Sequence, residues 1–83
     1  MTSAPRFTPA AHHHLRSLPR PTAMRVLAAL TALTENPAAP GQDTAPLGTA
    51  PGLVRLRSEG QRLACLVREG DLLVLTARAA DRR

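Results

Sequence analysis

The stretch from residue 53 to residue 79, LVRLRSEGQRLACLVREGDLLVLTARA, decides the fold of this 83-residue chain. Its first part alternates apolar and basic residues. Two apolar runs of strand length follow, and turn signals at Gly60 and at Glu69 and Gly70 separate them. The stretch therefore predicts three antiparallel strands joined by two hairpins.

Pairing across the first turn sorts the side chains of these strands onto two faces. If Arg57 pairs with Arg62, strand alternation gives an apolar face of Val54, Leu56, Leu63, Cys65 and Val67. It gives a basic face of Arg55, Arg57 and Arg62. A second pairing, of Val67 with Leu72, brings Val74 to the apolar face. A bulge at either turn glycine would reverse part of this assignment.

Two helices are predicted upstream of the strands. Thr8 and Pro9 suit the N-cap and first position of a helix, and Pro19 and Pro21 mark its end. The second helix, ending near Asn36, carries an apolar stripe at spacings of three and four. The stripe consists of Ala23, Val26, Leu27, Leu30 and Leu33.

These elements predict one α+β domain over residues 1–83. A helical hairpin (8–36) packs on a three- to four-stranded antiparallel sheet (53–79), and a loop rich in Pro, Gly and Ala (37–52) joins them. The first seven residues, MTSAPRF, form either a frayed terminus or a first edge strand.

The composition favours an anionic partner. The net charge is +5, and every basic residue other than histidine is arginine. Codon usage of a GC-rich genome explains arginine in place of lysine, whereas the excess of base over acid points to nucleic acid or an acidic protein. No apolar run approaches the length of a membrane span, and prolines interrupt the N-terminus, so we expect a cytoplasmic protein without a membrane partner.

Other side chains that could take part in chemistry also have a structural interpretation. Three successive histidines, His12, His13 and His14, point about 100° apart on a helix and cannot converge on one metal ion. Cys65 lies in the middle of a strand on the predicted apolar face, where a small buried side chain is expected. One cysteine also excludes an internal disulfide.

The order of elements, with local text such as RLRSEGQRL (55–63), resembles the RelE/ParE superfamily of type II toxin–antitoxin toxins. In its RelE branch this resemblance implies a ribosome-dependent mRNA endonuclease, in which the ribose 2′-OH attacks the next phosphate and basic side chains neutralise the developing charge. We expect no metal and no cofactor. By position in the family pattern, the implied catalytic residues are Arg55, Arg62 and Arg82. Arg57, Arg78 and Arg83 are candidate nucleic-acid contacts by their charge and position; the alternative is a solvated sheet face for Arg57 and a basic tail for Arg78 and Arg83.

The sequence departs from the family pattern at the positions of its stacking and acid–base groups. Gln61 and Cys65 stand where aromatic residues are usual, and Ala80 and Asp81 replace a glycine followed by lysine or histidine. Arginine stays protonated at any working pH and cannot serve as a general base. The phosphate-binding set is therefore kept, whereas the proton-transfer set is not.

Three functions remain open from the sequence. The first is a RelE-like toxin that acts on ribosome-bound mRNA by cleavage and arrests growth, with the ribosome and mRNA as partners. The second is a ParE-like inhibitor of DNA gyrase, which needs no general base. The third is a degenerate relative that only binds an antitoxin. For each, the resemblance implies a cognate acidic antitoxin, which the net charge would attract at low salt.

Overall fold

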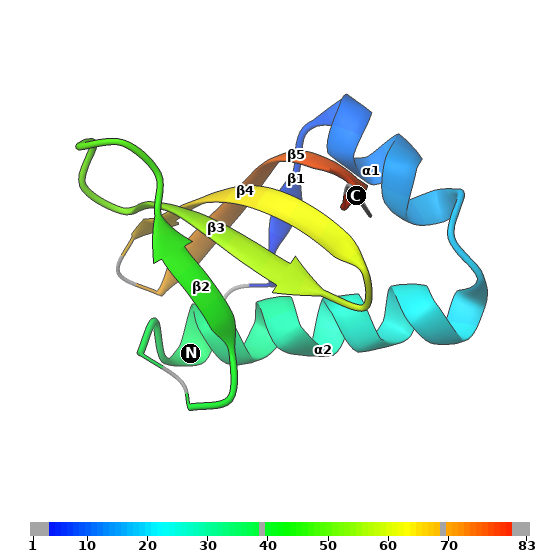
Figure 1. Cartoon of the computed structure of the whole chain (residues 1–83), viewed down its shortest axis with the longest axis horizontal. Coiled ribbons are helices and arrows are strands. Elements are labelled where there is room, and N and C mark those ends of the chain that lie inside the picture. The colour runs from blue at the N-terminus through cyan, green and yellow to red at the C-terminus, as the bar shows by residue number, and fades with distance from the viewer. Residues whose placement is uncertain (1–3, 39, 69, 81–83) are drawn as a thin grey trace.

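The computed structural model describes residues 4–38, 40–68 and 70–80. The helices are α1 (Pro9–Arg16) and α2 (Arg20–Glu35). The strands are β1 (Arg6–Phe7), β2 (Asp43–Pro46), β3 (Leu53–Ser58), β4 (Gln61–Arg68) and β5 (Asp71–Ala79). They form one sheet in the order β1-β5-β4-β3-β2, and Figure 1 shows α2 running along one side of this twisted sheet. No helix in these ranges is long and apolar enough to cross a membrane.

The start of α1 is fixed to the sheet by the residue that caps it. The Thr8 hydroxyl accepts a hydrogen bond from the Ala11 N–H at 3.3 Å and donates one to the Leu75 carbonyl at 2.7 Å. The Thr8 N–H also donates to the Val74 carbonyl at 3.1 Å. One threonine thus caps α1 and fixes the junction between β1 and α1 to β5. β1 runs parallel to β5.

Both helices pack on the predicted apolar face of the sheet. The two layers share one core, consisting of Ala11, Leu15, Val26, Leu30 and Leu33 from the helices and Leu56, Leu63, Cys65, Leu72 and Val74 from the strands. This confirms the apolar face and most of the helical stripe, although Ala23 and Leu27 are only partly buried. The α+β class and the helical hairpin are confirmed as well.

The sheet is larger than the sequence predicted, and it is mixed. Within the described residues it has five strands, since β1 pairs with β5 in parallel and β2 extends the other edge. Of the two alternatives for the N-terminal segment, Arg6 and Phe7 take the edge strand. The prediction of a loop is wrong for residues 43–46, which form β2. Their sequence gave no strand signal because Pro46 and Asp43 are of residue types that are depleted in strands.

The hairpin registers agree with the prediction, but the irregularity lies elsewhere. Arg57 pairs with Arg62, and Val67 pairs with Leu72. The bulge falls at neither turn glycine. It lies at Leu75, where Cys65 pairs with Val74 and the preceding Ala64 pairs with Thr76. The extra residue reverses the faces of β5 beyond it, which turns Thr76 and Arg78 away from the helices.

Candidate nucleic-acid interface

On the sheet face opposite the helices, four of the described arginines gather toward the turn between β3 and β4. Arg57, Arg62 and Arg78 lie directly opposite one another on β3, β4 and β5, and Arg55 lies two residues before Arg57 on the same face. We call these four residues the arginine face. Three of them were predicted on this face from alternation, and the bulge at Leu75 adds Arg78.

A pocket of about 500 Å³ lies within the arginine face. Its lining residues are Leu47, Arg55, Arg62, Leu63, Ala64, Thr76 and Arg78. The Nε atoms of Arg55 and Arg62 are buried and have no hydrogen-bond partner in the described part of the chain. Since buried polar groups are normally paired, these two N–H groups favour an oxygen ligand in the pocket.

The arginine face is destabilising by itself. Like charges directly opposite each other on neighbouring strands repel, and the row of Arg57, Arg62 and Arg78 contains two such pairs. One carboxylate offsets part of this charge, because Asp43 Oδ1 lies 3.5 Å from Arg55 Nη2. A bound anion with several oxygens would relieve the repulsion and fill the guanidinium forks at the same time.

Apolar side chains form the middle of this open face. Leu53, Leu66 and Leu73 lie side by side on β3, β4 and β5, and each is partly exposed. Leu47 adjoins them, since its N–H donates to the Leu53 carbonyl at 2.9 Å. A ligand that covers the whole face must therefore offer both negative charge and apolar surface.

Gln61 and Cys65, which stand in place of aromatics, both lie away from the arginine face. Gln61 shares the helix-covered side of β4, where a hydrogen bond of 2.7 Å joins its Oε1 to Nε2 of His14 on α1. Cys65 is fully buried, and burial raises the pKa of its thiol to about 12. At neutral pH the thiol is protonated, so it cannot act as a nucleophile. The substitution at Cys65 changes packing volume and not the open face.

The other described candidates, the exposed histidines of α1, do not reach the arginine face. His12 and His13 are exposed on α1, and among residues 4–38, 40–68 and 70–80 no three His, Cys, Asp or Glu side chains gather in a way that could hold a metal ion. Arg82 and Arg83 lie outside the described residues.

The sequence contained one signal for the position of Arg78. In β5 the residues that face the helices are even-numbered up to Val74 and odd-numbered from Ala77 onward, and in the sequence only the alternation of Thr76, Ala77, Arg78 and Ala79 marks the second phase. This change of phase, with polar Thr76 and Arg78 on the even positions, is the mark of a one-residue bulge.

This architecture, two helices on one face of a five-stranded mixed sheet, is the fold of the RelE toxins. The structure is similar to the isolated E. coli RelE toxin, with a TM-score of 0.74 and 19% identity. The similarity covers 95% of this chain and 85% of that toxin. It is also similar to a chain of the archaeal RelE–RelB complex from Pyrococcus horikoshii, with a TM-score of 0.82 and 22% identity over the full length of both chains. A chain of the RelB–RelE antitoxin–toxin complex from Methanococcus jannaschii follows, with a TM-score of 0.69 and 11% identity over 89% of this chain and 88% of the other. The sequence itself matches no family model and no curated protein.

Proposed function

We propose that this protein is the toxin of a type II toxin–antitoxin pair, of the RelE kind, and that it acts on ribosome-bound mRNA. The observation that carries the proposal is the arginine face, a set of guanidinium groups on the open side of a RelE-like sheet, of which only Arg55 is paired with a carboxylate among the residues that the structure describes. Such groups bind phosphates in a bidentate manner. An acidic antitoxin is the proposed protein partner, and the cytoplasm is the proposed compartment.

In the proposed reaction a ribose 2′-oxygen attacks the adjacent phosphorus, and the bond from phosphorus to the 5′-oxygen of the next nucleotide breaks. A 2′,3′-cyclic phosphate and a 5′-hydroxyl result. Arg55 and Arg62, which are partly buried with unpartnered Nε groups, would neutralise the charge that develops on the phosphate. Arg57 and Arg78, which are exposed, would hold neighbouring phosphates. Arg82 stays a proposed catalytic residue, and Arg83 a proposed contact, on the resemblance alone.

The proton of the 2′-OH needs an acceptor, and the described residues that line the pocket offer none that titrates near neutral pH. In the proposed reaction that proton passes to water, and the leaving 5′-oxygen takes one from water. The arginines then act on charge alone, which predicts slow cleavage with a weak dependence on pH between 6 and 8.

One observation favours a second candidate, a protein that binds without cutting. The same lack of a proton acceptor fits a member that only binds its antitoxin, and it fits a ParE-like inhibitor of DNA gyrase. Neither of these functions requires a general base. The three candidates differ in what happens to mRNA and to DNA when the protein is produced.

Induced expression with mapping of mRNA 5′ ends on isolated ribosomes separates them. We expect growth arrest with new 5′-hydroxyl ends in the ribosome-bound message, and at least tenfold weaker arrest for Arg62→Ala. Arg16→Ala is the matched control, because Arg16 is an exposed arginine of α1. Arrest with intact mRNA and an induced DNA-damage response would support gyrase inhibition, and unaltered growth would support the binding-only member.

A further inference from the structure

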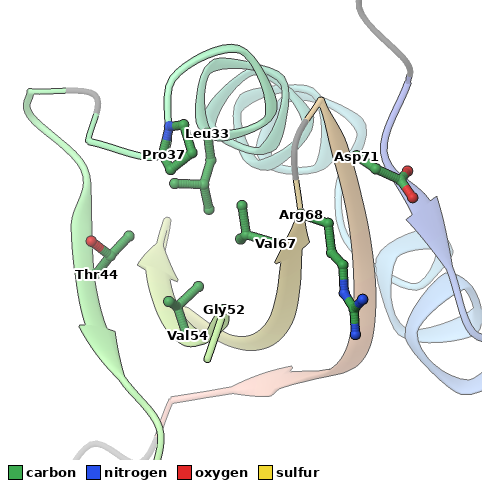
Figure 2. Close-up of a pocket in the computed structure, with 8 residues that line it drawn as sticks. All are labelled: Leu33, Pro37, Thr44, Gly52, Val54, Val67, Arg68 and Asp71. Carbon is green, nitrogen blue, oxygen red and sulfur yellow. The ribbon is translucent and has the colours of Figure 1, made fainter. Parts of the chain in front are cut away.

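The open face of β4 changes in side-chain size as well as in charge. Along the strand it carries, in order, Arg62, Ala64, Leu66 and Arg68. Figure 2 shows the end of this alternation, where Val67 is directed toward Leu33 of α2 and Arg68 is directed to the other side of the sheet. The small side chain of Ala64 thus lies between a basic position and an apolar one.

The neighbouring strands repeat this order. Ala64 pairs with Thr76 of β5, so two small side chains lie side by side. The row of Arg57, Arg62 and Arg78 lies on one side of them. On the other side lie four leucines, which we call the leucine row: Leu47, Leu53, Leu66 and Leu73. The pocket of the arginine face is the space that the two small residues leave between a basic wall and an apolar one.

This pocket is larger than a phosphate group requires. Its volume of about 500 Å³ lies within the range of roughly 300–1,000 Å³ that is typical of sites for small organic molecules. The buried Nε atoms of Arg55 and Arg62 favour an oxyanion on the basic side. Leu47 and Ala64 line the apolar side, where burial favours an uncharged group. A fitting ligand therefore joins an oxyanion to an uncharged group within one unit.

We propose that the pocket holds one whole nucleotide of single-stranded RNA, with its phosphate on Arg55 and Arg62. Its base packs over Ala64 against Leu47, and we call this apolar half of the pocket the base site. RNA as the ligand rests on the proposed function, whereas the base site is an addition to it. Every base has a flat face that can pack on a protein surface. Two-residue steps along one face of a strand measure about 6.6–6.8 Å, so the apolar wall is within reach of a base whose phosphate the arginines hold.

The base site works without an aromatic ring. The residues that line the pocket include none, so burial against aliphatic side chains holds the base. This interaction has no directional requirement, and it should accept each of the four bases. It also differs from the phosphate contacts in its response to salt, because only the charge interactions release counterions. Base binding and phosphate binding can therefore be measured separately.

Two RNA analogues of equal charge provide the test. One is hexauridylate with 2′-O-methyl groups, which lacks the nucleophile for cleavage, and the other is the same chain without its bases. We expect the chain with bases to bind about tenfold more tightly, as measured by fluorescence anisotropy of a labelled 5′ end. The slope of log affinity against log salt should be the same for both chains, because they contain the same number of phosphates.

One substitution fills the base site, and a matched one leaves it open. Ala64→Leu should weaken binding of the chain with bases by about tenfold and leave binding of the chain without bases within about twofold. Ala45→Leu is the control, because Ala45 is also partly buried, lies on the same open face in β2 and is absent from the pocket lining. It should change neither affinity by more than about twofold.

Two further variants keep the test independent of folding. Leu47→Ser removes the apolar wall, and it should weaken only the chain with bases, by about threefold. Leu47 lies outside the buried core, so this variant decides the question if Ala64→Leu does not fold. Arg62→Ala should weaken both chains alike and reduce the salt slope by about 0.7.

Equal affinity for the two chains, or equal weakening by Ala64→Leu and Ala45→Leu, would overturn the base site. Equally efficient displacement by ribose 5-phosphate and by uridine 5′-monophosphate would overturn it as well, because the pocket would then recognise the phosphate alone. These measurements use the isolated protein, whereas growth arrest and mRNA cleavage are measured in cells. Arrest without discrimination between the chains rejects only the base site, and discrimination without arrest rejects only the toxin function.

Discussion

The two faces of the sheet obey opposite physical rules. Leu56 and Arg57 are neighbours in β3, but Leu56 is fully buried beneath the helices and Arg57 is exposed among like charges. The helix-covered face lowers the free energy of the folded state through apolar burial, whereas the arginine face raises it through repulsion. The difference shows that the chain forms its fold with one face and keeps the other for a ligand, at some cost in stability.

The largest expected effect separates the two faces by adjacent substitutions. Leu56→Ala should lower the free energy of unfolding by about 2–5 kcal/mol, since it leaves a cavity in the core. A domain of this size has little more than that to lose. Arg57→Ala should stay within about 0.5 kcal/mol of the parent protein. Urea unfolding followed by circular dichroism measures both, and equal losses at the two positions would contradict the division into a structural and a functional face.

A pH effect should belong to the covered face alone. Burial raises the pKa of the Cys65 thiol to about 12, whereas the unfolded thiol titrates near its ordinary value of about 8.5. Above that value the unfolded state binds fewer protons than the folded state. Stability should therefore be fully retained below pH 8 and fall between about pH 8.5 and 12, by up to about 1.4 kcal/mol per pH unit.

The composition makes this pH slope assignable to one residue. The chain has no lysine and no tyrosine, the other side chains that titrate in that range. Cys65→Ala should lower the stability at pH 7 and abolish the slope above pH 8.5. A slope that survives in Cys65→Ala would show that the thiol is not its origin.

The covered face was largely predictable from sequence, and the open face only in part. Period-two alternation placed Leu56, Leu63 and Cys65 correctly, because burial imposes a strict pattern on a strand. The short strand β2 gave no such signal, since an edge strand of four residues with Pro46 needs no apolar alternation. The parallel pairing of β1 with β5 could not be predicted from sequence either, because a two-residue strand forms only through its hydrogen bonds to the neighbouring strand.

The turn that sets both faces in register carries a small strain. Glu59 has φ +54° and Gly60 has φ +75°, the two positive values that a two-residue type I′ turn requires and that Asn-Gly prefers. Glu59→Asn should raise the free energy of unfolding by about 0.5–1 kcal/mol. The exposed ion pair of Glu59 with Arg25, at 3.6 Å, contributes little, and Arg25→Ala serves as the control for its loss. Destabilisation by Glu59→Asn beyond the effect of Arg25→Ala would contradict the strain.

The smallest expected change in stability is the most informative about the open face. Arg78→Gln removes one of the two like-charge pairs of the row on β3, β4 and β5, so the folded protein without a ligand should gain a few tenths of a kcal/mol. The same substitution should weaken binding of single-stranded RNA and reduce the slope of log affinity against log salt by about 0.7, the contribution of one phosphate contact. Arg16→Gln, which removes the same charge from the exposed surface of α1, should change neither the stability nor the slope.

A gain in stability without a loss of binding would mean that Arg78 repels its neighbours but touches no phosphate. A loss of binding with an unchanged slope would mean that it acts by shape and not by charge. Only the opposite movement of stability and affinity in one variant identifies an arginine that the bulge at Leu75 has placed on this face to meet an anion.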